Sequence, residues 1–198
     1  MPQYLAYIVF IGAAVQLIGV AAYVKETLRG NTKPNRVTWF LWSVAPLIAT
    51  SAAIFKGVKL SVLPVFMSGF GPFLVLLASF ISKKSYWKLK SFDYLCGACS
   101  ILALIFWGIT KEPNSAILFA VVSDALAAIP TLIKSWKYPE TETVGAYTTG
   151  LFNAFTSFFA MKTWSFAEMA FPFYLVIVSS CLVISVSRKN FFSSKKPT

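Results

Sequence analysis

The chain has 198 residues, of which 57% are hydrophobic and 13% charged, and its formal net charge at pH 7 is +11. Soluble domains average about 25% charged residues, so this composition excludes an ordinary soluble domain and points to lipid. The positive charge does not indicate a nucleic-acid partner, because the Lys and Arg residues lie in short segments between apolar stretches, where they set membrane orientation.

Seven apolar stretches fill the chain, and none of them contains Lys or Arg. A helix needs about 20 apolar residues to cross a bilayer, with a range of about 17–25. Barrel strands would alternate apolar and polar residues, and a run such as Ile101–Trp107 does not. The sequence therefore predicts an all-α membrane protein with seven transmembrane helices. The stretches are Tyr4–Tyr23, Val37–Phe55, Leu60–Ser82, Phe92–Thr110, Ala116–Ile133, Val144–Met161 and Phe166–Val186.

The distribution of basic residues predicts the orientation. All but four of the 18 Lys and Arg residues lie in the first, third and fifth connections and the C-terminal tail. The four others are Lys56, Lys59, Lys111 and Lys162. By the positive-inside rule, the N-terminus is outside and the C-terminus cytoplasmic, in a bacterial inner membrane or a plasma membrane. No basic residue precedes Tyr4, so we expect the first helix to be retained rather than cleaved as a signal peptide.

An internal repeat follows from a shift of 105 positions, which superposes the second and third stretches on the sixth and seventh. Stretch boundaries and basic caps coincide under this shift, and Trp42 meets Tyr147. We therefore expect a 3+1+3 arrangement of parallel repeats. Its parts are a first bundle at 1–84, a linker helix within 85–114 and a second bundle with a basic tail at 115–198. The identical pairs are Pro34/Pro139, Thr38/Thr143, Phe66/Phe171, Leu77/Leu182, Ser82/Ser187 and Lys84/Lys189.

The segment from Ala128 to Lys137, followed by Glu140-Thr141-Glu142-Thr143 and Tyr147, resembles the signature of the SWEET and PQ-loop transporters. Pro130-Thr131 stands where that family has Pro-Gln, and the family's paired asparagines in the third and seventh helices are absent, so sugar specificity is not implied. The resemblance implies two three-helix bundles around a central pathway that opens alternately to each side. Related seven-helix folds also serve as cargo receptors.

Three polar residues lie deep within different stretches, where such groups are costly and are functional candidates. At 1.5 Å per residue, Asp124 lies ~12 Å, Asn153 ~13 Å and Gln16 ~18 Å into its stretch. Asp124 could bind a cationic solute, carry a proton, or hold two helices together as a protonated group. The two amides suit either a substrate pocket or a bond between helices. Their similar depth favours one shared polar site.

Further candidates concern breaks in the helices and aromatic contacts. Proline removes a helical hydrogen bond, so we predict hinges, with ordinary kinks as the alternative. Ser68 precedes one such break and is predicted to face a cavity. Trp42 and Tyr147 are predicted to stack on a substrate, whereas Trp39 fits an interfacial aromatic belt. The hinge candidates are Pro46, Gly71, Pro72, Pro130 and Pro172.

The remaining polar groups are predicted to be peripheral. We expect Glu168 to be solvated and Glu140 and Glu142 to form surface ion pairs. Cys96 and Cys99 form a CxxC, but the chain has no His and no second CxxC, so packing is favoured over metal or redox chemistry.

The pattern as a whole favours a transporter of a small polar solute over an enzyme, with no metal or cofactor and with proton coupling through Asp124 as an option. The alternative is a receptor, or an assembly or sorting factor, that does not transport. The lipid bilayer and the solute are the expected partners, no nucleic acid is expected, and a homo-oligomer is left open.

Overall fold

The computed structural model describes residues 6–82, 84–85, 87–110 and 112–193, and these residues form helices without a β-strand. The predicted first-span start at Tyr4 and the basic residues Lys83, Lys111, Lys195 and Lys196 lie outside the described residues. The α-helices are α1 (Ile8–Arg29), α2 (Arg36–Phe55), α3 (Leu63–Ile81), α4 (Ser91–Thr110), α5 (Pro113–Lys137), α6 (Val144–Ala160) and α7 (Phe166–Ser193), with short 3-10 helices η2 (Leu60–Val62) and η3 (Pro139–Thr141).

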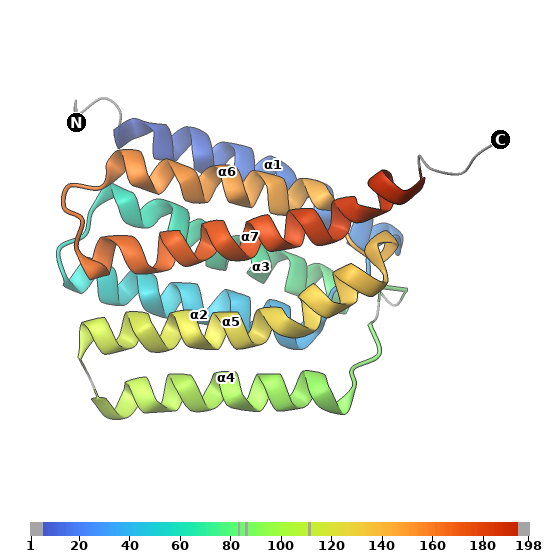
Figure 1. The fold of residues 1–198 in the computed structure, drawn as a ribbon, viewed down its shortest axis with the longest axis horizontal. Helices are drawn as coiled ribbons and strands as arrows, with labels where there is room; N and C mark the ends of the chain where they lie inside the picture. The colour runs from blue at the N-terminus through green and yellow to red at the C-terminus, as the bar shows by residue number, and fades with distance from the viewer. Residues whose placement is uncertain (1–5, 83, 86, 111, 194–198) are drawn as a thin grey trace.

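Six of these helices are long and apolar enough to cross a membrane, which makes the chain a multi-pass integral membrane protein. The α-helix outside this set is α6, which has 17 residues and so lies at the short end of the range for a span. It nevertheless runs beside α1 and α7 along the same bundle (Figure 1).

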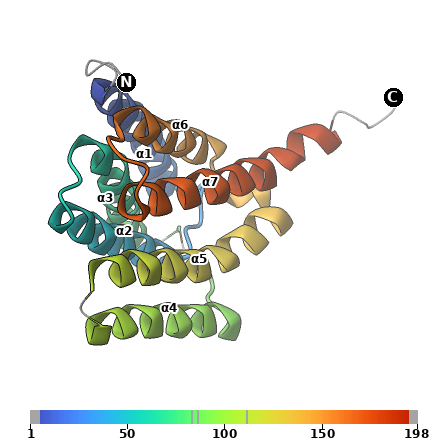
Figure 2. The same ribbon diagram turned by 60° about the vertical axis from the view of Figure 1, so that its left-hand side comes forward.

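The bundle is organised by pairs of adjacent helices. α1 packs against α3 and α6, α2 packs against α3 and α5, and α7 packs against α5 and α6. α4 lies at the edge, mainly against α5 (Figures 1 and 2). The hydroxyl of Ser100 on α4 donates to the carbonyl of Ser123 on α5 at 2.9 Å, which fixes the edge helix to the bundle.

The two ends of the bundle differ in charge. The α1–α2, α3–α4 and α5–α6 connections and the end of α7 lie together on the right of Figure 1. We call this the basic end because most of the Lys and Arg residues lie there. The opposite end holds the α2–α3, α4–α5 and α6–α7 connections, with Lys56, Lys59 and Lys162.

The surface of the bundle is apolar and its interior holds the polar side chains. Ile18, Phe80 and Ile109 are well exposed, whereas Gln16 and Asn153 are buried. A soluble monomer does not expose so much continuous apolar surface, so lipid is the expected surroundings. The polar residues therefore point inward, where they have to find partners within the protein.

The four predicted hinge prolines lie inside continuous helices: Pro46 in α2, Pro72 in α3, Pro130 in α5 and Pro172 in α7. α5 runs beside α4 over its first half and turns away over its second half, which contains Pro130 (Figures 1 and 2). A helix proline is a common cause of such a bend. The Thr38 hydroxyl donates to the carbonyl of Ala127 at 2.8 Å, one turn before the proline. Whether these prolines act as hinges stays a prediction.

The contact between α1 and α6 depends on two glycines. A Cβ atom at Gly12 would lie 2.5 Å from Thr156 Oγ1, and one at Gly19 would overlap Thr149. Close approach of this kind is the usual reason for small residues between membrane helices.

Replacing Gly12 or Gly19 by Ala is expected to lower the free energy of unfolding in detergent by about 1–3 kcal/mol, because the added methyl group overpacks the interface. Gly145→Ala on α6 is the matched control, since a Cβ there meets no atom within 4 Å. That variant should be neutral or slightly more stable. Equal effects of all three substitutions would contradict the close packing of α1 on α6.

Candidate functional site

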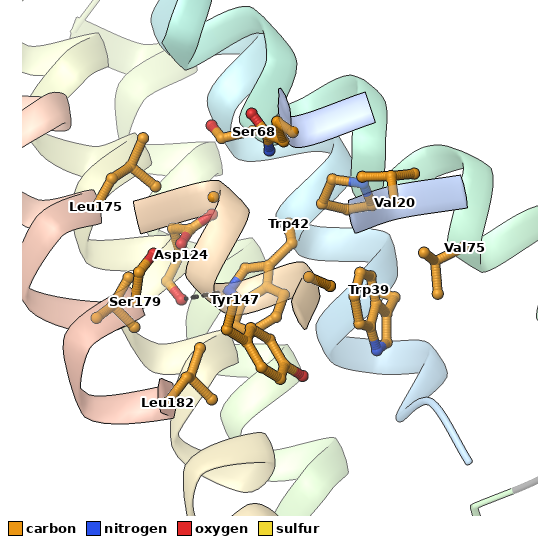
Figure 3. Close-up of a pocket in the computed structure, with 15 residues that line it drawn as sticks. Val20, Trp39, Trp42, Ser68, Val75, Asp124, Tyr147, Leu175, Ser179 and Leu182 are labelled. Atoms are coloured by element: carbon orange, nitrogen blue, oxygen red, sulfur yellow. Dashed lines mark hydrogen bonds between the residues drawn. The ribbon is translucent and has the colours of Figure 1, made fainter. Parts of the chain in front are cut away.

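A cavity of about 80 Å³ lies in the middle of the bundle (Figure 3). Every α-helix except α4 contributes to its lining. Of the six predicted substrate contacts, all but Asn153 line it. Its polar and aromatic lining residues are Gln16, Trp39, Trp42, Ser68, Asp124, Tyr147 and Ser179.

The size of the cavity limits what it can hold. One water molecule needs roughly 10–15 Å³ by this kind of measure. A cavity of about 80 Å³ therefore holds several waters or one small organic molecule. Between the cavity and the end of the bundle opposite the basic end, the core is packed with buried side chains such as Val65 and Phe171. A larger solute would require the helices to move apart.

Asp124 on α5 supplies a buried carboxylate to this cavity, and only 2% of its surface is exposed. The Tyr174 hydroxyl on α7 donates to Oδ2 at 2.6 Å. Trp42 Nε1 donates to the backbone carbonyl of Asp124 at 3.3 Å, as the dashed line in Figure 3 marks. Oδ1 finds no hydrogen-bond partner among the residues that the structure describes. A buried acceptor without a partner is costly, so this oxygen is a natural place for a ligand or a water.

Gln16 and Asn153 meet each other across the α1–α6 contact. Asn153 Nδ2 donates to Gln16 Oε1 and, at 3.1 Å, to the carbonyl of Pro64. Gln16 Nε2 donates to the carbonyl of Met67 at 3.3 Å. The two amides therefore join α1, α3 and α6, and Asn153 lies behind Gln16 rather than in the cavity wall. The inter-helix bonds are confirmed for both amides. Gln16 also lines the cavity, and its contact with a substrate stays a prediction.

Three aromatic side chains, Trp39, Trp42 and Tyr147, form the part of the cavity nearest the basic end. The ring centroids of Trp39 and Trp42 lie 5.5 Å apart, and Tyr23 packs on Trp39 at 4.8 Å. The prediction that Trp39 lies in an interfacial belt is wrong, because only 4% of its surface is exposed. Trp39 therefore packs against Tyr23 inside the bundle and does not face the lipid.

Beyond these rings lies a buried cluster that the sequence did not predict. Lys134 Nζ lies 2.5 Å from Glu142 Oε1, and the two side chains are 1% and 0% exposed. Glu142 Oε2 accepts hydrogen bonds from the Tyr23 hydroxyl at 2.6 Å and the Tyr147 hydroxyl at 2.7 Å. Lys134 Nζ also donates to the backbone carbonyl of Lys33. The predicted surface ion pair of Glu142 is therefore wrong.

A second acidic residue departs from its prediction. Glu168, expected to be solvated, is 8% exposed, and its Oε2 accepts from the backbone N–H groups of Lys162 at 2.8 Å and Thr163 at 3.2 Å. It organises the α6–α7 connection. At the basic end, Asp93 joins the start of α4 to the start of α2, because its Oδ1 accepts a hydrogen bond from Asn35 Nδ2 at 2.9 Å. Both acids therefore have a structural reason for their burial.

Metal chemistry has no support in the described part of the chain. No group of three His, Cys, Asp or Glu side chains comes together there, and Cys96 and Cys99 are free cysteines on α4. Neither cysteine lines the central cavity.

Comparisons of the chain with protein-family models, with curated proteins and with solved structures give no match. The features of the molecule that bear on function are the cavity, its charge and the helices around it.

Proposed function

We propose that this protein is a membrane transporter that moves a small polar solute by alternating access between two bundles, α1–α3 and α5–α7, with α4 as the linker. The observation that carries the proposal is the central cavity, in which the buried Asp124 keeps one oxygen without a partner. Ionisable groups at such depth mark substrate or ion pathways in membrane proteins. Catalysis has less support, because no hydrogen bond pairs a nucleophile with a base among the described residues that line the cavity.

The pattern of helix contacts supports a 3+1+3 repeat. If α1, α2 and α3 correspond to α5, α6 and α7, the α1–α3 contact corresponds to α5–α7, and α2–α3 to α6–α7. The same exchange turns the α1–α6 contact into α5–α2, which is also extensive. Trp42 and Tyr147, which are equivalent under the shift of 105, line the same cavity from opposite bundles. A twofold relation along the membrane normal accounts for all of these contacts.

In this proposal all seven helices cross the membrane, which for α6 rests on its 17 residues and its position between α1 and α7. The basic end faces the cytoplasm by the positive-inside rule, which puts the N-terminus outside. The protein would lie in a bacterial inner membrane or a plasma membrane. The resemblance of the Ala128–Tyr147 segment to the SWEET and PQ-loop transporters agrees with this arrangement.

The cluster of Tyr23, Lys134, Glu142 and Tyr147 is proposed as the closed gate at the basic end. Tyr23 of the first bundle donates to Glu142 of the second, and Lys134 of the second donates to the Lys33 carbonyl of the first. The backbone N–H of Lys33 also donates to the Thr141 carbonyl at 3.1 Å. These bonds join the bundles on one side of the cavity, so they have to break before a solute can leave on that side.

Counterflow of labelled solutes in proteoliposomes tests the proposal. We expect saturable counterflow with at least one class among amines, amino acids and sugars, and we expect Asp124→Asn to reduce it at least tenfold. Glu140→Gln is the matched control, because it makes the same change from acid to amide at an exposed position. Saturable binding without flux would favour the receptor alternative. Flux that Asp124→Asn leaves unchanged would contradict the proposed site.

Asp124 could also couple transport to protons, since a carboxylate in an apolar interior can exchange a proton as its surroundings change. In that case an inward proton gradient stimulates uptake, and Asp124→Asn abolishes the stimulation while exchange of solute for solute continues. Uptake that is indifferent to the gradient would remove this role from Asp124.

A further inference from the structure

We propose that the solute of this cavity is a small protonated amine that carries no carboxylate group. The inference rests on the proposed function, since it assigns a substrate class to the same cavity. Its basis is the combination of one incompletely bonded carboxylate, an aromatic wall and the lack of a basic side chain among the described lining residues.

The charge of the cavity favours a cation. Asp124 is the acidic side chain of the lining, and no Lys or Arg is present among the lining residues that the structure describes. Lys134 does not offer its charge to the cavity, because its ammonium group already bonds Glu142 and the Lys33 carbonyl. A buried carboxylate needs a positive partner or strong donors, and a solute ammonium supplies both.

The hydrogen bonds of Asp124 favour an N–H donor in particular. Oδ2 is occupied by the Tyr174 hydroxyl, and Oδ1 is buried without a partner. A primary ammonium group has three N–H donors, so one can serve Oδ1 in a charge-assisted hydrogen bond. A second can serve the side-chain oxygen of Ser179, which lines the same cavity from α7 (Figure 3).

The rest of the wall suits an organic cation with an apolar tail. The Trp42 ring lies beside Asp124, whose backbone carbonyl it bonds (Figure 3), and aromatic faces attract ammonium groups. On α7 the wall continues with Leu175, Val178 and Leu182, which offer apolar contact. An inorganic cation would make no apolar contact with these side chains. The cavity volume of about 80 Å³ limits the tail to a few carbon atoms.

A carboxylate on the solute would be penalised. It would enter a cavity whose described lining has no cationic side chain, and a buried charge without an opposite charge is strongly unfavourable. An amino acid therefore binds worse than the amine that corresponds to it after loss of the carboxyl group. This distinction separates the proposal from a general site for amino acids.

The test uses three matched probes on the protein in lipid nanodiscs: 3-methylbutylamine, 3-methylbutan-1-ol and leucine. Isothermal titration calorimetry should give an affinity for the amine at least tenfold higher than for the alcohol or for leucine. Quenching of tryptophan fluorescence offers a second readout, since Trp39 and Trp42 line the cavity. Asp124→Asn should lower the amine affinity at least tenfold and leave that of the alcohol unchanged.

Trp42→Phe and Trp42→Leu add an independent pair of variants. Loss of the aromatic face should weaken amine binding more in the leucine variant than in the phenylalanine variant. Leucine or alcohol binding as tightly as the amine, or an amine affinity that does not respond to Asp124→Asn, overturns the proposal. Absence of amine binding also overturns it. Counterflow of a sugar or an amino acid that depends on Asp124 would then leave the transporter standing and refute only the amine.

Discussion

Replacing Lys134 by Met is expected to lower the free energy of unfolding by about 3–5 kcal/mol, because it leaves the carboxylate of Glu142 buried without its cation. Both side chains are almost fully excluded from solvent, so water cannot replace the lost ammonium group. The Tyr23 and Tyr147 hydroxyls remain, but they share one carboxylate oxygen and do not neutralise the charge. Equilibrium unfolding in detergent micelles measures the effect.

Two further variants separate burial from charge. The double variant Lys134→Met/Glu142→Gln should recover most of the lost stability, because it removes both charges and keeps side chains of similar size. Lys56→Met should cost little, because the Lys56–Glu112 pair spans 3.5 Å and both side chains are well exposed. A loss in Lys134→Met no larger than in Lys56→Met would contradict the buried pair.

The apolar stretches predicted the helix bounds well where the helix ends at the same residue as the apolar stretch. The second stretch, Val37–Phe55, matches α2 within one residue. The first and fifth stretches end at Tyr23 and Ile133, yet α1 continues to Arg29 and α5 to Lys137. Apolarity marks the lipid zone, whereas a helix ends where its backbone bonds are capped. At α1 the cap is Gly30 at a φ of 86°, a signal that the sequence contains.

The candidate site could be predicted in part, because burial of a polar group in a span has few explanations. Gln16 and Asp124 line one cavity, as their similar depth in the sequence indicated, and Ser68 lines it beside the predicted helix break. Asn153 shares that depth but turns toward α1 and α3. Depth along a helix fixes the level of a side chain and leaves its direction around the helix open. Direction depends on how the seven helices pack, which hydropathy does not specify.

The cluster at the basic end could not be predicted, for a different reason. Lys134 and Glu142 stand at the two ends of a segment rich in charge that contains Pro139, which is typical of a solvated connection. Their burial comes from tertiary contacts, since Tyr23 of α1 and the α1–α2 connection cover them. The one signal in the sequence is the tyrosine at 147, five residues after Glu142 and close enough to bond it.

Tyr23→Phe is expected to open the proposed gate at the basic end. The substitution removes a hydrogen bond between a hydroxyl and a buried carboxylate, worth about 1.5–3 kcal/mol, and this bond joins the two bundles. If closed and open states are in equilibrium, a loss of that size raises the open fraction roughly 10–100-fold. Ser179→Cys, placed in a background without Cys96, Cys99 and Cys181, reports the change. Its labelling by a membrane-impermeant thiol reagent from the basic end should accelerate by the same factor.

Tyr147→Phe is the decisive control for this prediction. It also removes one hydroxyl from Glu142 Oε2, at 2.7 Å instead of 2.6 Å, so the local loss of bonding is nearly identical. Tyr147 and Glu142 both belong to the second proposed bundle, whereas Tyr23 belongs to the first. A gate between moving bundles therefore responds to Tyr23→Phe and hardly to Tyr147→Phe. Equal acceleration in both variants would mean that the cluster stabilises the fold locally and does not control access to the cavity.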